Sequence, residues 1–238
     1  LQAEFRDREA MDHMEDHEME GAESFRDLVR EDVAAEGREA GGYTKEATSS
    51  SQSQIEQLEE DIEDDPQNVG KIVRLASLYE DNDDIENAER VLEDALERMP
   101  ENYSVREAWG NLKFRNYDRA IESIRDQLKE DPQSTELQEK LDQIQQERRE
   151  FAVQEYSWRA DSHPTDLALQ YNLGQALYET GQYKDAIACF QRSRSAAGLM
   201  LDSTIMLGRC FIHQGQYDLA IEQFQRALDE HEQMDEKG

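Results

Sequence analysis

A 34-residue pattern occurs twice in immediate succession between Leu167 and Leu228. In each copy, two pairs of apolar or small residues with a spacing of four stand on either side of a glycine-containing turn. The first copy carries Leu173, Gly174, Leu177, Gly181, Tyr183, Ala186 and Phe190; the second carries Leu207, Gly208, Phe211, Gly215, Tyr217, Ala220 and Phe224. A spacing of four places side chains on one face of an α-helix. We therefore predict four helices, Leu167–Thr180, Tyr183–Ser195, Thr204–Gln214 and Tyr217–Glu230.

The spacing and residue types of both copies resemble the tetratricopeptide repeat (TPR), in which an L-G-x2-Y element and an A-x3-F element recur with this period. The resemblance implies an all-α fold, a TPR-type α-solenoid of stacked helical hairpins. It also implies that small residues lie where helices approach closely and that phenylalanines pack inward. The repeat-packing residues are Gly174, Ala186, Phe190, Gly208, Ala220 and Phe224.

A third copy of the pattern runs from Leu75 to Pro100, with Ala76 and Ala88 at the two small positions. The sequence Asn82-Asp83-Asp84 supplies its turn. Upstream, an apolar stripe of Ile55, Leu58 and Ile62 is typical of the second helix of a preceding repeat. Residues 53–100 are therefore predicted to form an N-terminal TPR-like unit, and residues 165–238 two well-formed TPRs with a charged tail.

Residues 101–164 follow the repeat less closely, because Pro100, Pro132 and Pro164 are 32 rather than 34 positions apart. No Gly or Pro occurs from Glu136 to Trp158, where a turn of a repeat would fall. Apolar residues at alternating spacings of three and four favour two long antiparallel helices joined near Pro132. The alternative is a pair of degenerate TPR hairpins, which would leave the function unchanged.

Residues 1–52 form an acidic lead, which we predict to be partly disordered with short helices and interrupted by Ser49-Ser50-Ser51. His13 and His17 have the spacing that places two imidazoles on one helical face. A metal site needs a third fixed ligand and groups that orient the rings. Neither is evident, so solvated histidines are expected, with no metal and no cofactor.

The whole chain of 238 residues carries 26 Lys and Arg against 56 Asp and Glu, a net charge of −30. This balance argues against a nucleic acid partner, because phosphate binding requires clustered cations, and it permits a basic protein partner. No apolar run approaches the ~18 residues of a membrane span. Cys189 and Cys210 are expected to be buried free thiols. We expect a cytoplasmic location; the sequence begins with Leu1, so any targeting segment upstream lies outside it.

In TPR arrays the first helix of each hairpin lines a concave surface that faces ligand peptides. By register, these positions in the third copy are Gly70, Val73, Ser77 and Glu80. In the two C-terminal copies the candidate groove residues are Tyr171, Asn172, Gln175, Tyr178, Ile205, Arg209, Ile212 and His213. Aromatic and Arg side chains are frequent anchors at interfaces. The alternative is that these residues pack against a neighbouring segment of the same chain.

Some TPR domains bind a terminal carboxylate through lysine and asparagine at fixed first-helix positions. These positions here hold residues other than lysine, namely Val73, Ser77, Glu107, Asn111, Tyr171 and Gln175. A clamp for a chaperone tail is therefore not expected. Nor does the chain carry a phosphate loop, a nucleophile elbow or a zinc signature. Its carboxylates fall at spacings typical of solvent-facing helix surfaces, so we do not predict an enzyme.

The function predicted from the sequence is a non-enzymatic scaffold that binds a protein or peptide through the concave groove. The alternative is a structural or assembly module, a spacer that self-associates through an uncapped C-terminal repeat. The final segment, Asp229–Gly238, is short and charged, so Ile221 and Leu228 are expected to form an exposed apolar strip. On this ground, and because Leu1 stands in place of an initiating Met, we expect further repeats or a second copy to cover the strip.

Overall fold

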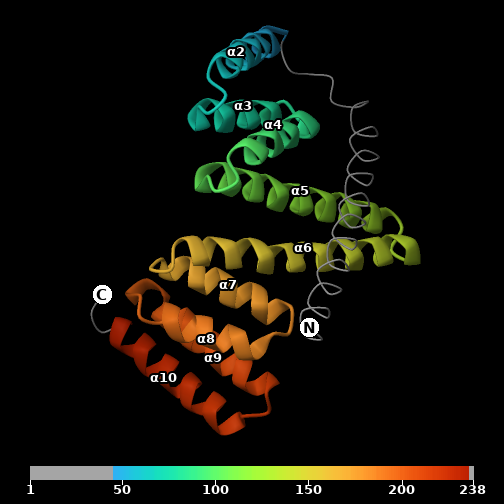
Figure 1. Ribbon diagram of the computed structural model, residues 1–238. Helices are drawn as coiled ribbons and strands as arrows, with labels where there is room; N and C mark the ends of the chain where they lie inside the picture. The colour runs from blue at the N-terminus through green and yellow to red at the C-terminus, as the bar shows by residue number, and fades with distance from the viewer. Residues whose placement is uncertain (1–44, 236–238) are drawn as a thin grey trace, which may run out of the picture. The chain divides into compact units, whose positions relative to one another are not determined.

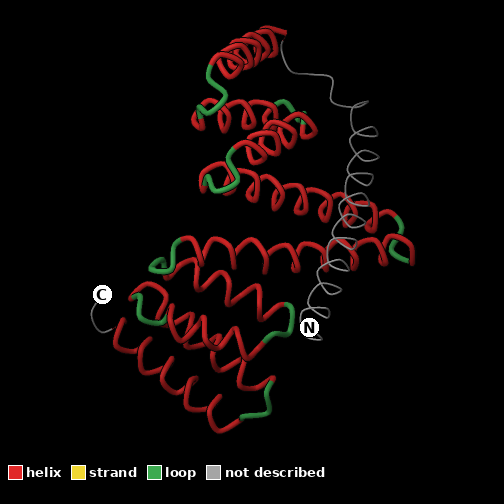
Figure 2. Tube along the Cα trace, in the orientation of Figure 1, coloured by secondary structure: helices red, strands yellow, loops and turns green. Residues whose placement is uncertain are grey.

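The computed structural model describes residues 45–235, and the side chains of residues 51–232. These residues form helices joined by short turns, without a strand among them (Figures 1 and 2). They fall into two compact units, divided between Gln145 and Gln146 within one continuous helix. His13, His17 and most of the predicted acidic lead lie outside the described residues. The all-α class and the TPR-type solenoid are confirmed.

The first unit contains α2 (Lys45–Asp64), α3 (Val69–Asp81), α4 (Ile85–Arg98), α5 (Tyr103–Glu130) and the first part of α6 (Thr135–Ser162). Ile55, Leu58 and Ile62 of α2 pack against the core as the apolar stripe predicts. The predicted interruption at Ser49–Ser51 is wrong, because α2 runs through these residues. Serine lowers helix stability by only about half a kcal/mol per residue. The three serines at positions 49–51 therefore do not interrupt α2.

An asparagine or aspartate caps the start of each of four helices. Asn68, Asp84, Asn102 and Asp166 accept hydrogen bonds from backbone N–H groups in the first turns of α3, α4, α5 and α7. Such a cap satisfies donors that the helix itself leaves unpaired. These residues therefore fix where the helices begin.

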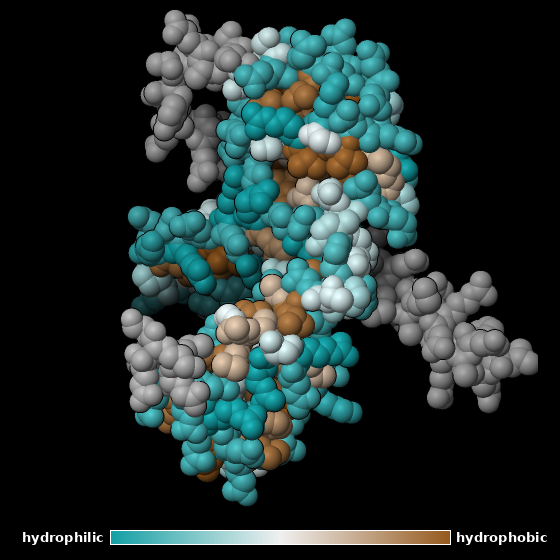
Figure 3. Space-filling view, turned by 90° about the vertical axis from the view of Figure 1, so that its left-hand side faces the viewer, coloured by the Kyte–Doolittle hydropathy of each residue, from teal (hydrophilic) through white to brown (hydrophobic). Residues whose placement is uncertain are grey.

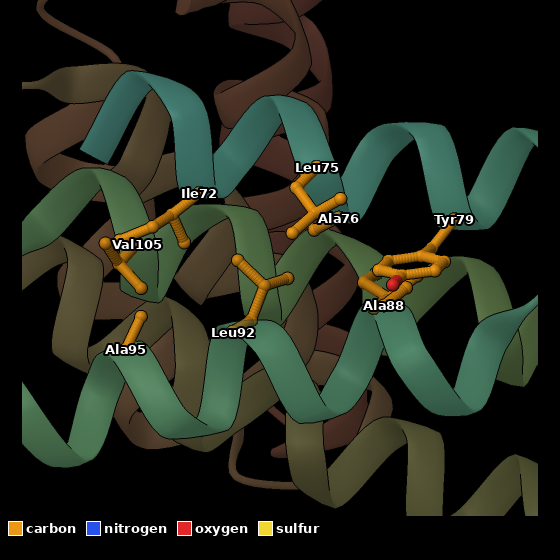
Figure 4. Close-up of a cluster of buried hydrophobic side chains, with 9 residues drawn as sticks. Ile72, Leu75, Ala76, Tyr79, Ala88, Leu92, Ala95 and Val105 are labelled. Carbon is orange, nitrogen blue, oxygen red and sulfur yellow. The ribbon is translucent and has the colours of Figure 1, made fainter. Parts of the chain in front are cut away.

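The core of the first unit lies between α3, α4 and the start of α5 (Figure 4). Its buried side chains are Ile72, Leu75, Ala76, Tyr79, Ala88, Leu92, Ala95, Val105 and Leu112. Ala88 and Ala95 are fully buried, which allows the larger side chains to fill the space between the helices. The third repeat copy thus folds as the predicted hairpin.

Between residues 101 and 164 the structure has two long helices, α5 and α6, rather than two repeat hairpins. They are joined by a turn through Pro132 and pack through a second cluster of buried residues, Ala120, Ile121, Ile124, Leu141 and Ile144. The absence of any Gly or Pro from Glu136 to Trp158 explains why α6 is not interrupted.

The second unit contains the rest of α6, α7 (Leu167–Glu179), α8 (Tyr183–Ser193), the 3-10 helix η1 (Ala197–Leu199), α9 (Met200–His213) and α10 (Tyr217–Asp235). α8 packs against both α7 and α9, and α10 packs chiefly against α9. α7, α8 and α10 begin where the sequence predicts. The predicted start of α9 at Thr204 is wrong by four residues, because its N-cap, Leu199, offers no capping side chain that would mark it. α10 also continues beyond its predicted end at Glu230.

The turns of the three hairpins share one backbone geometry. The second residue after each first helix has a positive φ, namely Asp83 (61°), Gly181 (78°) and Gly215 (72°). In each turn the next N–H donates back to a helix carbonyl: Asp84 to Tyr79 at 2.9 Å, Gln182 to Leu177 at 2.8 Å, and Gln216 to Phe211 at 2.9 Å. This is the Schellman arrangement, for which glycine is favoured at the left-handed position.

The core of the second unit surrounds Phe190, which is fully buried together with Ala186. Cys189 and Cys210 belong to the same cluster as free thiols, as predicted. Burial raises the pKa of both thiols, that of Cys210 to about 12. Both therefore stay protonated at neutral pH, which is typical of structural cysteines.

Candidate functional site

The predicted groove residues lie on α7 and α9, the first helices of the two C-terminal hairpins. On α7, Tyr171, Asn172, Gln175 and Tyr178 are half-buried. On α9, Ile205 is half-buried, whereas Arg209, Ile212 and His213 are exposed, Ile212 to 45%. The two helices therefore present aromatic, aliphatic and cationic groups to solvent.

Three rings connect the ends of these helices. The hydroxyl of Tyr178 lies 3.0 Å from Nε2 of His213. The imidazole also stacks on Tyr183 of α8, with ring centroids 4.4 Å apart and planes 9° from parallel. Tyr178 and Tyr183 meet edge to face at 5.5 Å. Such contacts fix the rings relative to one another, so Tyr178 and His213 form a rigid edge of the α7–α9 surface.

Tyr171 and Arg209 lie on the same surface, close enough for the guanidinium to affect the pKa of the tyrosine. Gln175 donates a hydrogen bond from Nε2 to the Tyr171 hydroxyl at 3.3 Å, and the Tyr171 ring contacts Phe190 edge to face. Burial, together with the Asp202 carboxylate, raises the pKa of Tyr171, and the Arg209 guanidinium opposes this shift. Tyr171 therefore keeps its proton at neutral pH. Arg209 itself is exposed and makes a weak contact with Met206 Sδ at 3.7 Å.

In the first unit the corresponding first-helix positions line a hollow of about 350 Å³ between α3 and α5. Three predicted positions, Val73, Ser77 and Glu80, line it from α3, whereas Gly70 does not. Glu107 and Asn111 line it from α5. Five side chains at positions selected by the repeat register thus surround one recess.

Arg115 also lines this hollow, although the repeat register did not predict this residue. Its guanidinium donates to both carboxylate oxygens of Glu80, from Nε at 2.5 Å and from Nη2 at 2.7 Å. Arg119 lies 3.5 Å from the same carboxylate. Arg115 follows Asn111 by four and Glu107 by eight positions, so the three residues share one face of α5. The same spacing could therefore have predicted Arg115 as a lining residue.

Two buried charge pairs correct the expectation that the carboxylates face solvent. Glu89 accepts from Lys113 Nζ at 3.2 Å and from Asn116 Nδ2 at 3.0 Å, between α4 and α5. Along α6, Arg159 Nε donates to Glu155 at 2.8 Å, with Glu155 completely buried. A buried carboxylate needs such partners because its desolvation is costly. In a sequence this rich in charge, nothing distinguished these residues from the exposed ones.

The end of the second unit exposes large apolar side chains on α10. The exposed fraction is 64% for Tyr217, 54% for Ile221 and 64% for Leu228. The strip predicted around Ile221 and Leu228 is therefore present among the described residues. On the face of the molecule drawn in Figure 3, apolar side chains appear as patches within a largely hydrophilic surface.

Comparison with protein families matches two models, both of the tetratricopeptide repeat. One covers residues 142–199 and 171–235, and the other covers residues 72–102, so that together they span more than half of the chain. The chain belongs to the tetratricopeptide repeat family. This assignment makes it a protein-interaction scaffold in general terms.

Solved structures of MamA share the fold. A crystal structure of MamA protein is 14% identical, with 91% of this chain and 95% of that chain covered and a TM-score of 0.51. A MamA structure from AMB-1 is 16% identical, covering 77% and 84%, with a TM-score of 0.50. YrrB, described as a TPR protein with an unusual peptide-binding site, is 17% identical, covering 74% and 93%, with a TM-score of 0.41. No curated protein sequence matches the chain.

None of the described helices combines the length and the apolar character that crossing a membrane requires.

Proposed function

We propose that the chain binds a protein or peptide segment along the first helices of its hairpins. The observation that carries this proposal is the α7–α9 surface, where Tyr171 and Ile205 are half-buried beside the exposed Arg209. Aromatic and arginine side chains presented on a rigid scaffold are effective anchors for a partner. No catalytic role is part of this proposal, and the predicted cytoplasmic location stays a prediction.

The chemistry of the surface limits the ligand. Apolar contacts would come from Tyr171, Ile205 and Ile212, whereas Arg209 would donate hydrogen bonds to a carboxylate or a backbone carbonyl. The protonated hydroxyl of Tyr171 offers a further polar contact, already aligned by Gln175. The proposed ligand is therefore an apolar segment with an acidic or carbonyl group placed to meet Arg209.

The hollow between α3 and α5 is the proposed counterpart in the first unit. Ala76, Leu92 and Leu112 give it an apolar lining, and Ser77 and Asn111 offer hydrogen-bonding groups. Because Glu80 is already paired with Arg115, the recess suits a small apolar side chain better than a charged one.

Affinity capture with the full chain tests the proposal. Arg209→Ala and Tyr171→Ala should each reduce the recovery of specific partners while leaving the circular dichroism unchanged. Arg226→Ala, which removes an exposed cation from α10 outside the groove, is the matched control. If all three variants recover the same partners in equal amounts, groove binding is wrong.

The second candidate is an assembly function, in which the exposed Tyr217, Ile221 and Leu228 of α10 contact another chain. An assembly module of this kind would leave capture by the groove variants unchanged.

A further inference from the structure

We propose that the exposed face of α10 is a docking site for an amphipathic helix of another protein, whose apolar stripe is bordered by lysine or arginine. The site is separate from the groove on α7 and α9. Three features of the described residues lead to it: an apolar stripe, the corresponding face of α8, which a helix covers, and an acidic border.

The apolar stripe consists of Tyr217, Ile221 and Leu228. Their spacings of four and seven place them on one face of α10. Each is more than half exposed, although the neighbouring Ala220 and Ala227 are buried. Several large apolar side chains exposed on one face of a helix indicate an interaction surface.

The equivalent face of the preceding hairpin shows what such a stripe receives. Tyr183 and Ile187 occupy on α8 the positions that Tyr217 and Ile221 occupy on α10, 34 residues earlier. Both are half-buried and pack in the cluster around Phe190. α9 lies against this face, and its His213 ring stacks on Tyr183. We therefore infer that a helix placed like α9 fits on α10, with a flat side chain over Tyr217.

The border of the stripe differs sharply between the two hairpins. On α10 the outward border carries Asp218, Glu222 and Asp229, and all three are exposed. The positions 34 residues earlier on α8 are Lys184, Ala188 and Ser195. A basic and two neutral residues are thus replaced by three carboxylates. The helix that covers α10 consequently needs cations along the edge of its own stripe, because opposite charges across an interface favour docking.

The same border disfavours a second copy of this chain. In a twofold pairing of two antiparallel α10 helices, the acidic border of one copy lies beside the acidic border of the other. Like charges placed across an interface oppose association. The net charge of −30 on each chain adds to this repulsion.

The test uses the full chain and two fluorescent helical peptides with the same leucine stripe, bordered by lysine in one and by glutamate in the other. We expect the lysine-bordered peptide to bind at least about tenfold more tightly in fluorescence anisotropy. Ile221→Ser should weaken its binding by about tenfold or more, since an apolar contact is lost. Helicity should be unchanged because Ile221 is exposed.

Charge reversal separates docking from general attraction to an acidic chain. The triple variant Asp218→Lys, Glu222→Lys, Asp229→Lys should reverse the preference between the two peptides. The control, Glu97→Lys, Glu101→Lys, Glu130→Lys, makes the same change at exposed positions of the first unit and should not. Arg209→Ala should leave binding intact, so failure here is distinguishable from failure of the groove proposal.

Equal affinity for both peptides, or an equal effect of the control reversal, would overturn the proposal. So would a stable dimer of the unliganded chain that Ile221→Ser abolishes in sedimentation, because the occupant would then be a second copy.

Discussion

A Cβ atom built on Gly208 would lie 2.6 Å from Cε1 of Phe224, a distance shorter than Cβ atoms keep from their neighbours in proteins. The preceding hairpin repeats the arrangement, with 2.8 Å between a Cβ built on Gly174 and Cε1 of Phe190. In both cases a phenylalanine ring from the second helix lies directly on the backbone of the first. The glycine and the phenylalanine sixteen positions later are thus two halves of one contact.

Gly208→Val should therefore destabilise the second unit by ~1–3 kcal/mol, because the added side chain displaces the Phe224 ring. Thermal or urea unfolding of the full chain measures the effect. Gly198→Ala serves as the control, since a Cβ at Gly198 meets nothing within 4 Å. An unchanged midpoint for Gly208→Val would mean that the ring moves aside freely.

Lys113→Met should cost ~3 kcal/mol, because it leaves the buried carboxylate of Glu89 with only the amide of Asn116. Adding Glu89→Met to the same chain should restore most of this loss, since the unpaired charge is then gone. Urea unfolding of the two single variants and the double variant gives the coupling energy. Additive losses would contradict this account.

The hydroxyl of Tyr79 donates to Glu59 of α2 at 2.5 Å. Burial, and then this hydrogen bond, raise the pKa of Tyr79 from 10.0 to about 12. The folded chain therefore holds this proton more tightly than the unfolded chain. The associated stability is complete below pH 10.0 and is lost as the pH rises towards about 12.

Tyr79→Phe should remove this dependence, so that the free energy of unfolding falls less steeply than in the wild type over that range. Urea unfolding across the range tests it, with Tyr217→Phe as a control at an exposed tyrosine. Parallel curves for wild type and Tyr79→Phe would show that the hydroxyl does not contribute.

Gly181→Ala should destabilise the second unit by ~1 kcal/mol, purely through its positive φ, since a Cβ there meets no other atom within 4 Å. Asp83 has the same turn geometry with a side chain, so Asp83→Gly should gain up to ~1 kcal/mol. Its ion pair with Arg119, at 3.7 Å and largely exposed, offsets little of that gain. A loss of stability in Asp83→Gly would contradict the explanation from backbone strain.

The fold was largely predictable because its repeat leaves local signals: a small residue under each aromatic ring, a turn after each first helix, and apolar stripes along α5 and α6. The start of α9 was not predictable, because Leu199 caps without a side-chain hydrogen bond. The continuation of α2 through its serines was also missed, because tertiary contacts of Ile55 and Leu58 outweigh weak local propensities.

The candidate site was predicted only as a set of positions. Register alone selected Tyr171 and Arg209, but it could not show that Tyr178 and His213 contact each other. The pairing of Glu80 with Arg115 joins residues 35 positions apart in sequence. Such contacts depend on how one helix lies on the next, which no single helix encodes.

Among the described helices, α8 and α10 have different numbers of neighbours, which predicts different hydrogen exchange. α8 is held between two helices, whereas α10 packs chiefly against one, so local opening should begin at α10 and proceed inward. A helix docked on the face of Tyr217 and Ile221 would supply the missing neighbour. Amide protection in α10 would then rise towards that of α8. The partner would raise the free energy of local unfolding in the second unit.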